Sequence, residues 1–157
     1  MKIKLVLIGK TENNFSRTQI SEYSKRINHY VSFEIKEINY LKNTKNLSAE
    51  QQKIKEGDLM LGSFSSKDYV ILLDEKGKEF TSVEFSGFIE NKIIIGSKNI
   101  IFVIGGGYGF SENVYKRADI QVSLSKLTFP HQLVRVIFLE QLYRAFTIIK
   151  GEPYHHV

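Results

Sequence analysis

The sequence predicts an α/β domain in which a mostly parallel sheet is flanked by helices. Short apolar runs, typical of buried strands, alternate along the 157 residues with segments of helical periodicity. No internal repeat, low-complexity tract or shift in composition divides the chain. We therefore expect a single domain that spans residues 1–157.

The chain begins with the apolar run KIKLVLIG, residues 2–9, which predicts a buried strand. Residues 14–30 carry aromatic and branched side chains at roughly helical spacing and predict a helix. Residues 31–38 alternate apolar with polar side chains, as a second strand would. The polar residues 41–47 predict a loop.

The next helix is expected to begin at Ser48, because Ser48 and Gln51 form a capping-box pattern. It should end near Gly57 or Gly62. The run YVILLD, residues 69–74, then predicts a third strand, and the segment EKGKEF that follows should turn away from it.

A second capping-box pattern, Thr81 with Glu84, predicts the start of another helix that continues to about Ile94. Residues 99–104 are branched and apolar and predict the fourth strand. Ser111 should cap a short helix after that strand.

Residues 120–124 predict the fifth strand, and Pro130 should open the longest helix, about residues 131–150. This helix has apolar side chains around most of its circumference, whereas a helix that covers one face of a monomer should show one polar side. We expect one face to pack on the sheet of its own chain and the other on a second copy, which predicts a homodimer. The alternative is a central helix buried within one chain.

The composition is typical of a soluble protein with a modest basic excess. The formal net charge of +5 comes from 22 basic and 17 acidic side chains, which suits an RNA or phosphate-bearing partner and equally a solvated surface. The chain contains no cysteine, which excludes disulfides and thiolate metal sites and is compatible with the cytoplasm. The terminal histidine pair lacks a third ligand, so no metal is expected, and no window approaches the about 20 apolar residues of a membrane span.

The run IFVIGGGYGF, residues 101–110, places three consecutive glycines after a predicted strand. A dinucleotide fingerprint would need glycine at the position of Phe110, and the GKT at residues 9–11 lacks the earlier glycine of a phosphate-binding loop. The glycines could expose backbone amides to a flat ligand such as adenine, or could form a tight turn with positive φ angles.

A second segment, LSKLTFPHQLVRV at residues 124–136, connects the last predicted strand to the last helix. His131 follows Pro130 at the start of that helix, and Arg135 lies one turn further along the same face. On its own, a histidine beside a proline is more often a capping or packing residue than a catalyst.

The segments FVIGGGYG and LSKLTFPHQLVRVIFLEQLYRAF, with the terminal GEPYHH, resemble the ribosomal large-subunit RNA methyltransferase H family (YbeA-like) of the SPOUT superfamily. The resemblance covers the whole chain in length and order, includes the start MKIKLVLIGK, and is strongest from Phe102 to His155. It implies an α/β fold whose C-terminal part forms a deep trefoil knot, and it implies a homodimer.

The same resemblance implies a function. Such proteins use S-adenosylmethionine to methylate N3 of a pseudouridine in the helix 69 loop of 23S rRNA, on the assembled ribosome. The expected partners are therefore that rRNA and a second copy of the chain, with no DNA and no membrane, and the expected location is the cytoplasm.

The resemblance also assigns site residues. The family's cofactor positions fall on Leu73, Gly105, Leu124, Ser125, Lys126, Leu127, Thr128 and Phe129. The family's C-terminal Tyr-His pair falls on Tyr154 and His155, and its helical arginine falls on Arg144. Leucine and phenylalanine side chains could wall an adenine, while the glycines permit a close approach to the backbone.

The imide nitrogen N3 must lose its proton before or during attack on the methyl group. We expect His155 to act as a base or an orienting group, and Tyr154 as a stacking platform or a hydrogen-bond partner for the base. Arg144 could stabilise the imide anion or hold a phosphate. Basic side chains that could contact phosphates, or be plain surface, are Lys10, Arg17, Lys25 and Arg26.

Two other functions stay open at this point. The chain could be a methyltransferase of the same fold that acts on another RNA, such as a tRNA. It could also be a ribosome-binding dimer without catalysis, which would take up no S-adenosylmethionine.

Overall fold

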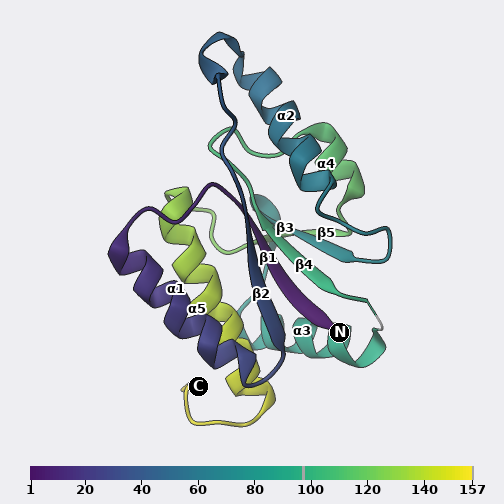
Figure 1. Cartoon of the computed structure of the whole chain (residues 1–157). Coiled ribbons are helices and arrows are strands. Elements are labelled where there is room, and N and C mark those ends of the chain that lie inside the picture. Colours follow the sequence, from purple (N-terminus) through teal and green to yellow (C-terminus); the bar gives the residue numbers. More distant parts are fainter. Residues whose placement is uncertain (97, 157) are drawn as a thin grey trace.

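The computed structural model describes residues 1–96 and 98–156, and its described strands form one five-stranded, fully parallel sheet with helices on both faces (Figure 1). The strand order across the sheet is β2-β1-β4-β3-β5. This confirms the predicted α/β class. The elements are, in chain order, β1 (Lys2–Ile8), α1 (Asn14–Asn28), β2 (Ser32–Ile38), the 3-10 turn η1 (Thr44–Asn46), α2 (Ala49–Leu61), β3 (Tyr69–Glu79), α3 (Ser82–Ile95), β4 (Ile100–Ile104), α4 (Glu112–Arg117), β5 (Ile120–Ser123) and α5 (His131–Ile149).

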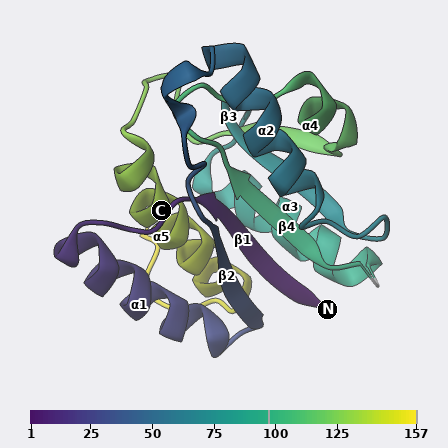
Figure 2. The same ribbon diagram turned by 45° about the horizontal axis from the view of Figure 1, so that its top comes forward.

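The sheet lies between two helical layers. Helices α1, α3 and α5 cover one face, and α2 and α4 cover the other (Figures 1 and 2). Side chains alternate along the strands between the two faces of the sheet. Phe102 of β4 therefore lies in the core between the sheet and helices α1, α3 and α5, whereas Val103 lies in the core between the sheet and helices α2 and α4. Both faces are covered, which is why β4 is apolar and buried throughout. Phe102 also contacts Phe138 of α5, with ring centroids 4.7 Å apart.

The predicted helix starts are confirmed by their caps. Ser48 and Thr81 each head a complete capping box, in which the side chain three residues later bonds back to the cap backbone. Ser111 caps α4 by accepting from the Val114 backbone N–H. Of the two glycines expected to end α2, the structure uses Gly62.

The prediction that the chain turns away after residue 74 is wrong, because β3 continues to Glu79. Leu73 and Lys78 both pair with Val122 of β5, so residues 74–77 bulge out of the ladder before the strand resumes. Gly77 permits this, since a Cβ there would lie 2.6 Å from the Val122 nitrogen. The bulge carries polar side chains to the carboxyl edge of the sheet.

Helix α5 packs on the sheet and between its neighbours α1 and α3. Contacts with α1, α3 and the sheet of the same chain bury most of the apolar side chains around α5. This agrees with the alternative prediction of a central helix buried within one chain. Leu133 is its large apolar side chain left well exposed, at 46%. The apolar character of α5 therefore no longer argues for a homodimer, and that prediction needs support from other parts of the surface.

Candidate functional site

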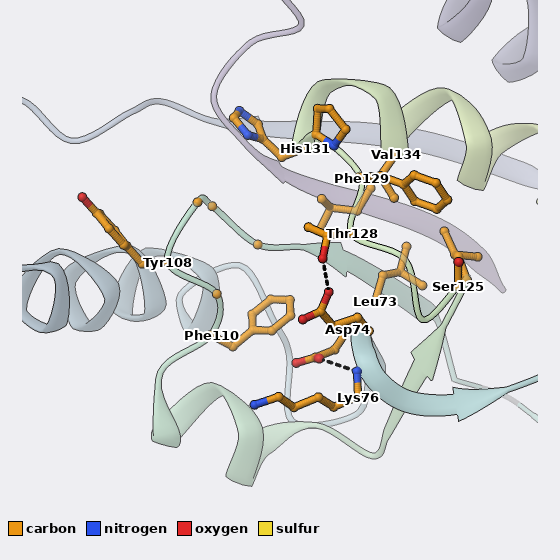
Figure 3. A pocket seen from close by; sticks show the side chains of 18 of the residues that line it. Leu73, Asp74, Lys76, Tyr108, Phe110, Ser125, Thr128, Phe129, His131 and Val134 are labelled. Atoms are coloured by element: carbon orange, nitrogen blue, oxygen red, sulfur yellow. Dashed lines mark hydrogen bonds between the residues drawn. The ribbon is translucent and has the colours of Figure 1, made fainter.

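A cleft of about 700 Å³ opens at the carboxyl edge of the parallel sheet. Three segments enclose it: the bulge that follows Leu73 in β3, the glycine loop after β4, and the connection from β5 to α5 (Figure 3). Open parallel sheets bind ligands at this edge, because the connections that leave the strands there can form a crevice. The volume falls within the about 300–1,000 Å³ typical of small-molecule sites.

Seven of the eight predicted cofactor residues line this one cleft. They are Leu73, Gly105, Leu124, Ser125, Leu127, Thr128 and Phe129. Further lining side chains include Ile104 and Val134. The eighth predicted residue, Lys126, does not line it, because its side chain is 82% exposed and pairs with Glu79 at 3.4 Å.

The two interpretations of the glycine loop apply to different glycines. Gly109 has φ of +81° and donates its N–H to the Gly106 carbonyl at 3.1 Å, so it forms a tight turn. Gly107 has nothing within 4 Å of the place a Cβ would take, so its backbone is open to a ligand. A Cβ on Gly105 would lie 3.1 Å from the Phe110 ring, so packing within the loop also favours glycine there.

Acidic and phenolic groups that sequence reasoning missed complete the cleft wall. Asp74 accepts a short hydrogen bond from the Tyr115 hydroxyl and another from the Lys76 backbone N–H at 2.9 Å. Burial, and then the bond to Asp74, raise the pKa of Tyr115, so the phenol stays protonated. Glu75 accepts from the Thr128 hydroxyl at 2.8 Å (Figure 3). The signal in the sequence was the pair of carboxylates, Asp74 and Glu75, where the apolar run of the third strand ends.

The start of α5 closes one end of the cleft. His131 lines it, and the Nε2 atom of that ring lies 3.2 Å from the Tyr40 hydroxyl. Arg135 is buried and donates to the Ile8 carbonyl at 2.7 Å and to the Thr11 hydroxyl at 3.1 Å. Burial lowers the pKa of Arg135. Arg135 thus ties α5 to the end of β1.

The three predicted catalytic residues contact one another at the other end of α5. Arg144 Nη1 lies 3.1 Å from His155 Nδ1, and the guanidinium stacks over the Tyr154 ring at 4.8 Å. Glu140, which sequence reasoning did not single out, accepts from both Arg144 and the Tyr154 hydroxyl. Burial, and then Glu140, raise the pKa of Tyr154. We call Glu140, Arg144, Tyr154 and His155 the C-terminal cluster.

None of the C-terminal cluster lines the cleft of its own chain. Helix α5 runs from His131 at the carboxyl edge of the sheet towards the opposite edge, where the chain ends (Figure 1). A rise of about 1.5 Å per residue places Arg144 about 20 Å along the helix axis from His131. The two groups of predicted site residues are therefore each assembled, but apart from one another.

The whole chain matches known proteins. A family model described as "Predicted SPOUT methyltransferase" matches residues 1–155. The chain belongs to this SPOUT methyltransferase family. Relatives named "Ribosomal RNA large subunit methyltransferase H" are 58% identical in Christiangramia forsetii, 54% in Parabacteroides distasonis and 54% in Flavobacterium johnsoniae. Each alignment covers 156 residues, 99% of this chain and 99% of the relative.

Membership of the SPOUT methyltransferase family confirms the resemblance drawn from the glycine loop, the 124–136 segment and the C-terminal residues. It also implies the C-terminal trefoil knot that belongs to this fold. Across residues 1–96 and 98–156, no helix has the length and apolar character to cross a membrane. The same residues contain no cluster of three or more histidine and carboxylate side chains suited to a metal ion.

Proposed function

We propose that this chain is an S-adenosylmethionine-dependent methyltransferase that methylates N3 of a pseudouridine in the helix 69 loop of 23S rRNA. In this proposal residues 1–157 act as one domain, as a homodimer, on the assembled ribosome in the cytoplasm. The observation that carries it is the convergence of seven expected cofactor residues on one cleft, in a chain whose close relatives carry a ribosomal RNA methyltransferase name.

The cleft suits a nucleoside that bears no phosphate. Leu73, Leu124 and Leu127 offer apolar walls for an adenine, and the open backbone at Gly107 offers donors and acceptors for its edge. The carboxylate of Asp74 suits ribose hydroxyls or the positive charge of a sulfonium. S-adenosylmethionine supplies an activated methyl group on its sulfonium, and the residues of the chain supply orientation and electrostatics.

The C-terminal cluster suits the reaction of an imide. The target base gains negative charge when N3 loses its proton, and the Arg144 guanidinium is a positive charge held next to His155. The half-buried ring of Tyr154 offers a surface on which a base turned out of its stack could lie. The basic excess of the chain provides attraction to phosphates.

A second copy of the chain would join the two parts of the site. Reacting groups must approach to about 3–3.5 Å, whereas about 20 Å of helix separates the cluster from the cleft in one chain. Around the cleft the side chains of Leu127 and Tyr108 are exposed, at 74% and 54%, and Leu133 lies near by at the start of α5. Apolar exposure around a polar cleft is typical of a surface that another protein covers.

The central experiment measures methyl transfer from labelled S-adenosylmethionine to whole ribosomes and to free rRNA, and then maps the modified nucleotide. We expect transfer to the ribosome at N3 of a helix 69 pseudouridine. Methyl transfer only to a tRNA would show that the enzyme has another RNA target. If calorimetry detects no binding of S-adenosylmethionine, the remaining interpretation is a ribosome-binding dimer without catalysis.

A mixing experiment tests the shared site. Gly105→Val should obstruct the cleft, because even a Cβ lies 3.1 Å from Phe110, and His155→Ala removes one member of the C-terminal cluster. Each variant alone should lose most of its methyl-transfer activity. Mixed dimers hold one intact cleft facing one intact cluster and should regain part of the activity, whereas sites built within single chains would regain none.

A further inference from the structure

The geometry of the C-terminal cluster points to a specific role for His155, which we propose is a hydrogen-bond donor. Its Nε2–H would donate to a carbonyl oxygen of the target imide, held in that orientation by Glu140 acting through Arg144. His155 is then not the base that removes the N3 proton. This inference rests on the proposed function, and it assigns Glu140 as a positioning residue.

The contact between Arg144 and His155 fixes the tautomer of the imidazole ring. An arginine guanidinium has only donors, so the Nη1 atom of Arg144, 3.1 Å from His155 Nδ1, must donate to that nitrogen. Nδ1 therefore presents its lone pair, and the ring proton of the neutral imidazole lies on Nε2. A nitrogen that carries the proton donates, and it has no lone pair with which to accept one.

Glu140 holds the guanidinium in place for this contact. Its Oε1 atom accepts from Arg144 Nη2 at 2.6 Å and from Arg144 Nε at 3.0 Å. The carboxylate raises the pKa of Arg144, so the donor stays charged. Gln141 and Tyr154 also donate to Glu140, at 2.7 and 3.1 Å, so the carboxylate itself is fixed.

Aromatic packing limits the motion of the remaining parts. The guanidinium of Arg144 lies over the Tyr154 ring, and that ring meets Tyr143 edge-on with centroids 4.8 Å apart. Within residues 1–96 and 98–156 no protein group bonds to Nε2 of His155, and the ring is only partly buried. Nε2–H is therefore available to a ligand.

A donor is useful because the charge of a deprotonated imide lies largely on its two carbonyl oxygens. The N3 proton leaves to water. The N3 electron pair then forms the bond to the methyl carbon, while the bond from carbon to sulfur breaks and its electron pair stays on sulfur, so the sulfonium becomes a neutral thioether. A preorganised donor at an oxygen beside N3 stabilises the anion that attacks.

Two substitutions separate a donor from a base. Glutamine ends in an amide near the position of Nε2, so His155→Gln keeps a donor and an acceptor for Arg144 but cannot take up a proton. His155→Ala should lower kcat by about 100-fold, as loss of one such donor does, whereas His155→Gln should stay within about tenfold of the wild type. If both variants fall equally far, His155 is not a donor.

A spectroscopic measurement tests the tautomer without methyl transfer. Nitrogen-15 correlation spectra of the full chain should show the neutral His155 ring protonated at Nε2. Glu140→Gln should shift His155 towards a mixture of tautomers and lower kcat with little change in the KM for ribosomes. Glu152→Gln is the matched control, since Glu152 lies in the same C-terminal segment but accepts from the Tyr30 hydroxyl instead.

The outcomes of these experiments are distinct. A proton on Nδ1 in the wild type would overturn the donor role even in an active enzyme. An Nε2 tautomer in a wild type that transfers no methyl group to ribosomes would overturn the proposed function, and the donor role with it.

Discussion

The exposed side chain of Leu127 offers a sharp test of the cofactor cleft. Leu127 lines the cleft but is 74% exposed, so its side chain contributes little to folding and can be buried by a ligand. Full burial of a leucine stabilises by about 1.5–3 kcal/mol, and roughly three quarters of that is available here. Leu127→Ala should therefore weaken cofactor binding by about 1.4 kcal/mol, which is tenfold in Kd.

The assay is calorimetric titration with S-adenosylmethionine, beside urea unfolding of the same samples. The matched control is Ile95→Ala, because Ile95 is 76% exposed at the end of α3 and lies outside the cleft. Both variants should unfold within about 0.5 kcal/mol of the wild type. Sedimentation of the Leu127 variant shows whether its dimer is intact. An unchanged Kd for S-adenosylmethionine, in a variant that still forms the dimer, would refute the role of Leu127 as a wall of the cofactor cleft.

Three further predictions concern the loop, the core and the pH dependence. Gly106→Ala should lower the free energy of unfolding in urea by about 1–3 kcal/mol, because a Cβ there would collide with the buried carboxylate of Glu56. Gly107→Ala is the control, since a Cβ at Gly107 meets no neighbouring atom. Equal losses of stability in the two variants would contradict this prediction. Phe138→Ala removes a fully buried ring, and calorimetry should show a loss of about 3–5 kcal/mol and a Tm roughly 10 °C lower; an unchanged Tm would contradict it. Burial, and then the bond to Glu152, raise the pKa of Tyr30 to about 12, so its stabilising effect is complete below pH 10.0 and is lost as the pH rises through 12. Tyr30→Phe should make the fall in unfolding free energy across that range less steep, with Tyr115 and Tyr154 still contributing to it, and an equal slope in both proteins would refute the assignment.

The elements that sequence reasoning predicted well are those with local causes. A strand such as β4 is buried on both faces, so its residues are all apolar, and this pattern needs no knowledge of the neighbouring strands. The capping boxes at Ser48 and Thr81 are equally local, because each involves residues three positions apart. Both features could be predicted from a short window of sequence.

The bulge in β3 could not be predicted in this way, because its cause lies elsewhere in the chain. The segment EKGKEF looks like a turn, and it resumes as a strand only because β5 offers Val122 as a partner a second time. Gly77 is required by the backbone of Gln121 and Val122, which are more than forty positions away in sequence. The missed carboxylate of Asp74 follows from the same cause, since the bulge places it in the cleft.

Residues that are consecutive in a sequence motif do not all line the cleft, as Lys126 shows. The resemblance to the family predicted all six residues from Leu124 to Phe129 as cofactor positions, yet the chain turns within them and Lys126 does not line the cleft. The Ser125 hydroxyl accepts from the Leu127 backbone N–H at 3.0 Å, and this turn leaves the Lys126 side chain in solvent beside Glu79. If Lys126 contributes to binding, it does so through its backbone.

Helix α5 separates the cleft from the C-terminal cluster within one chain. Its first residue, His131, lines the cleft, and its last turns carry Arg144 beside His155. A straight helix keeps these ends about 20 Å apart, and packing on α1, α3 and the sheet prevents the helix from bending to join them. In the homodimer that we propose, a surface outside α5 would bring the cleft of one copy to the C-terminal cluster of the other. The side chains of Leu127 and Tyr108 are apolar and exposed at the cleft, and they are the surface on which we propose that the cluster of a second copy docks.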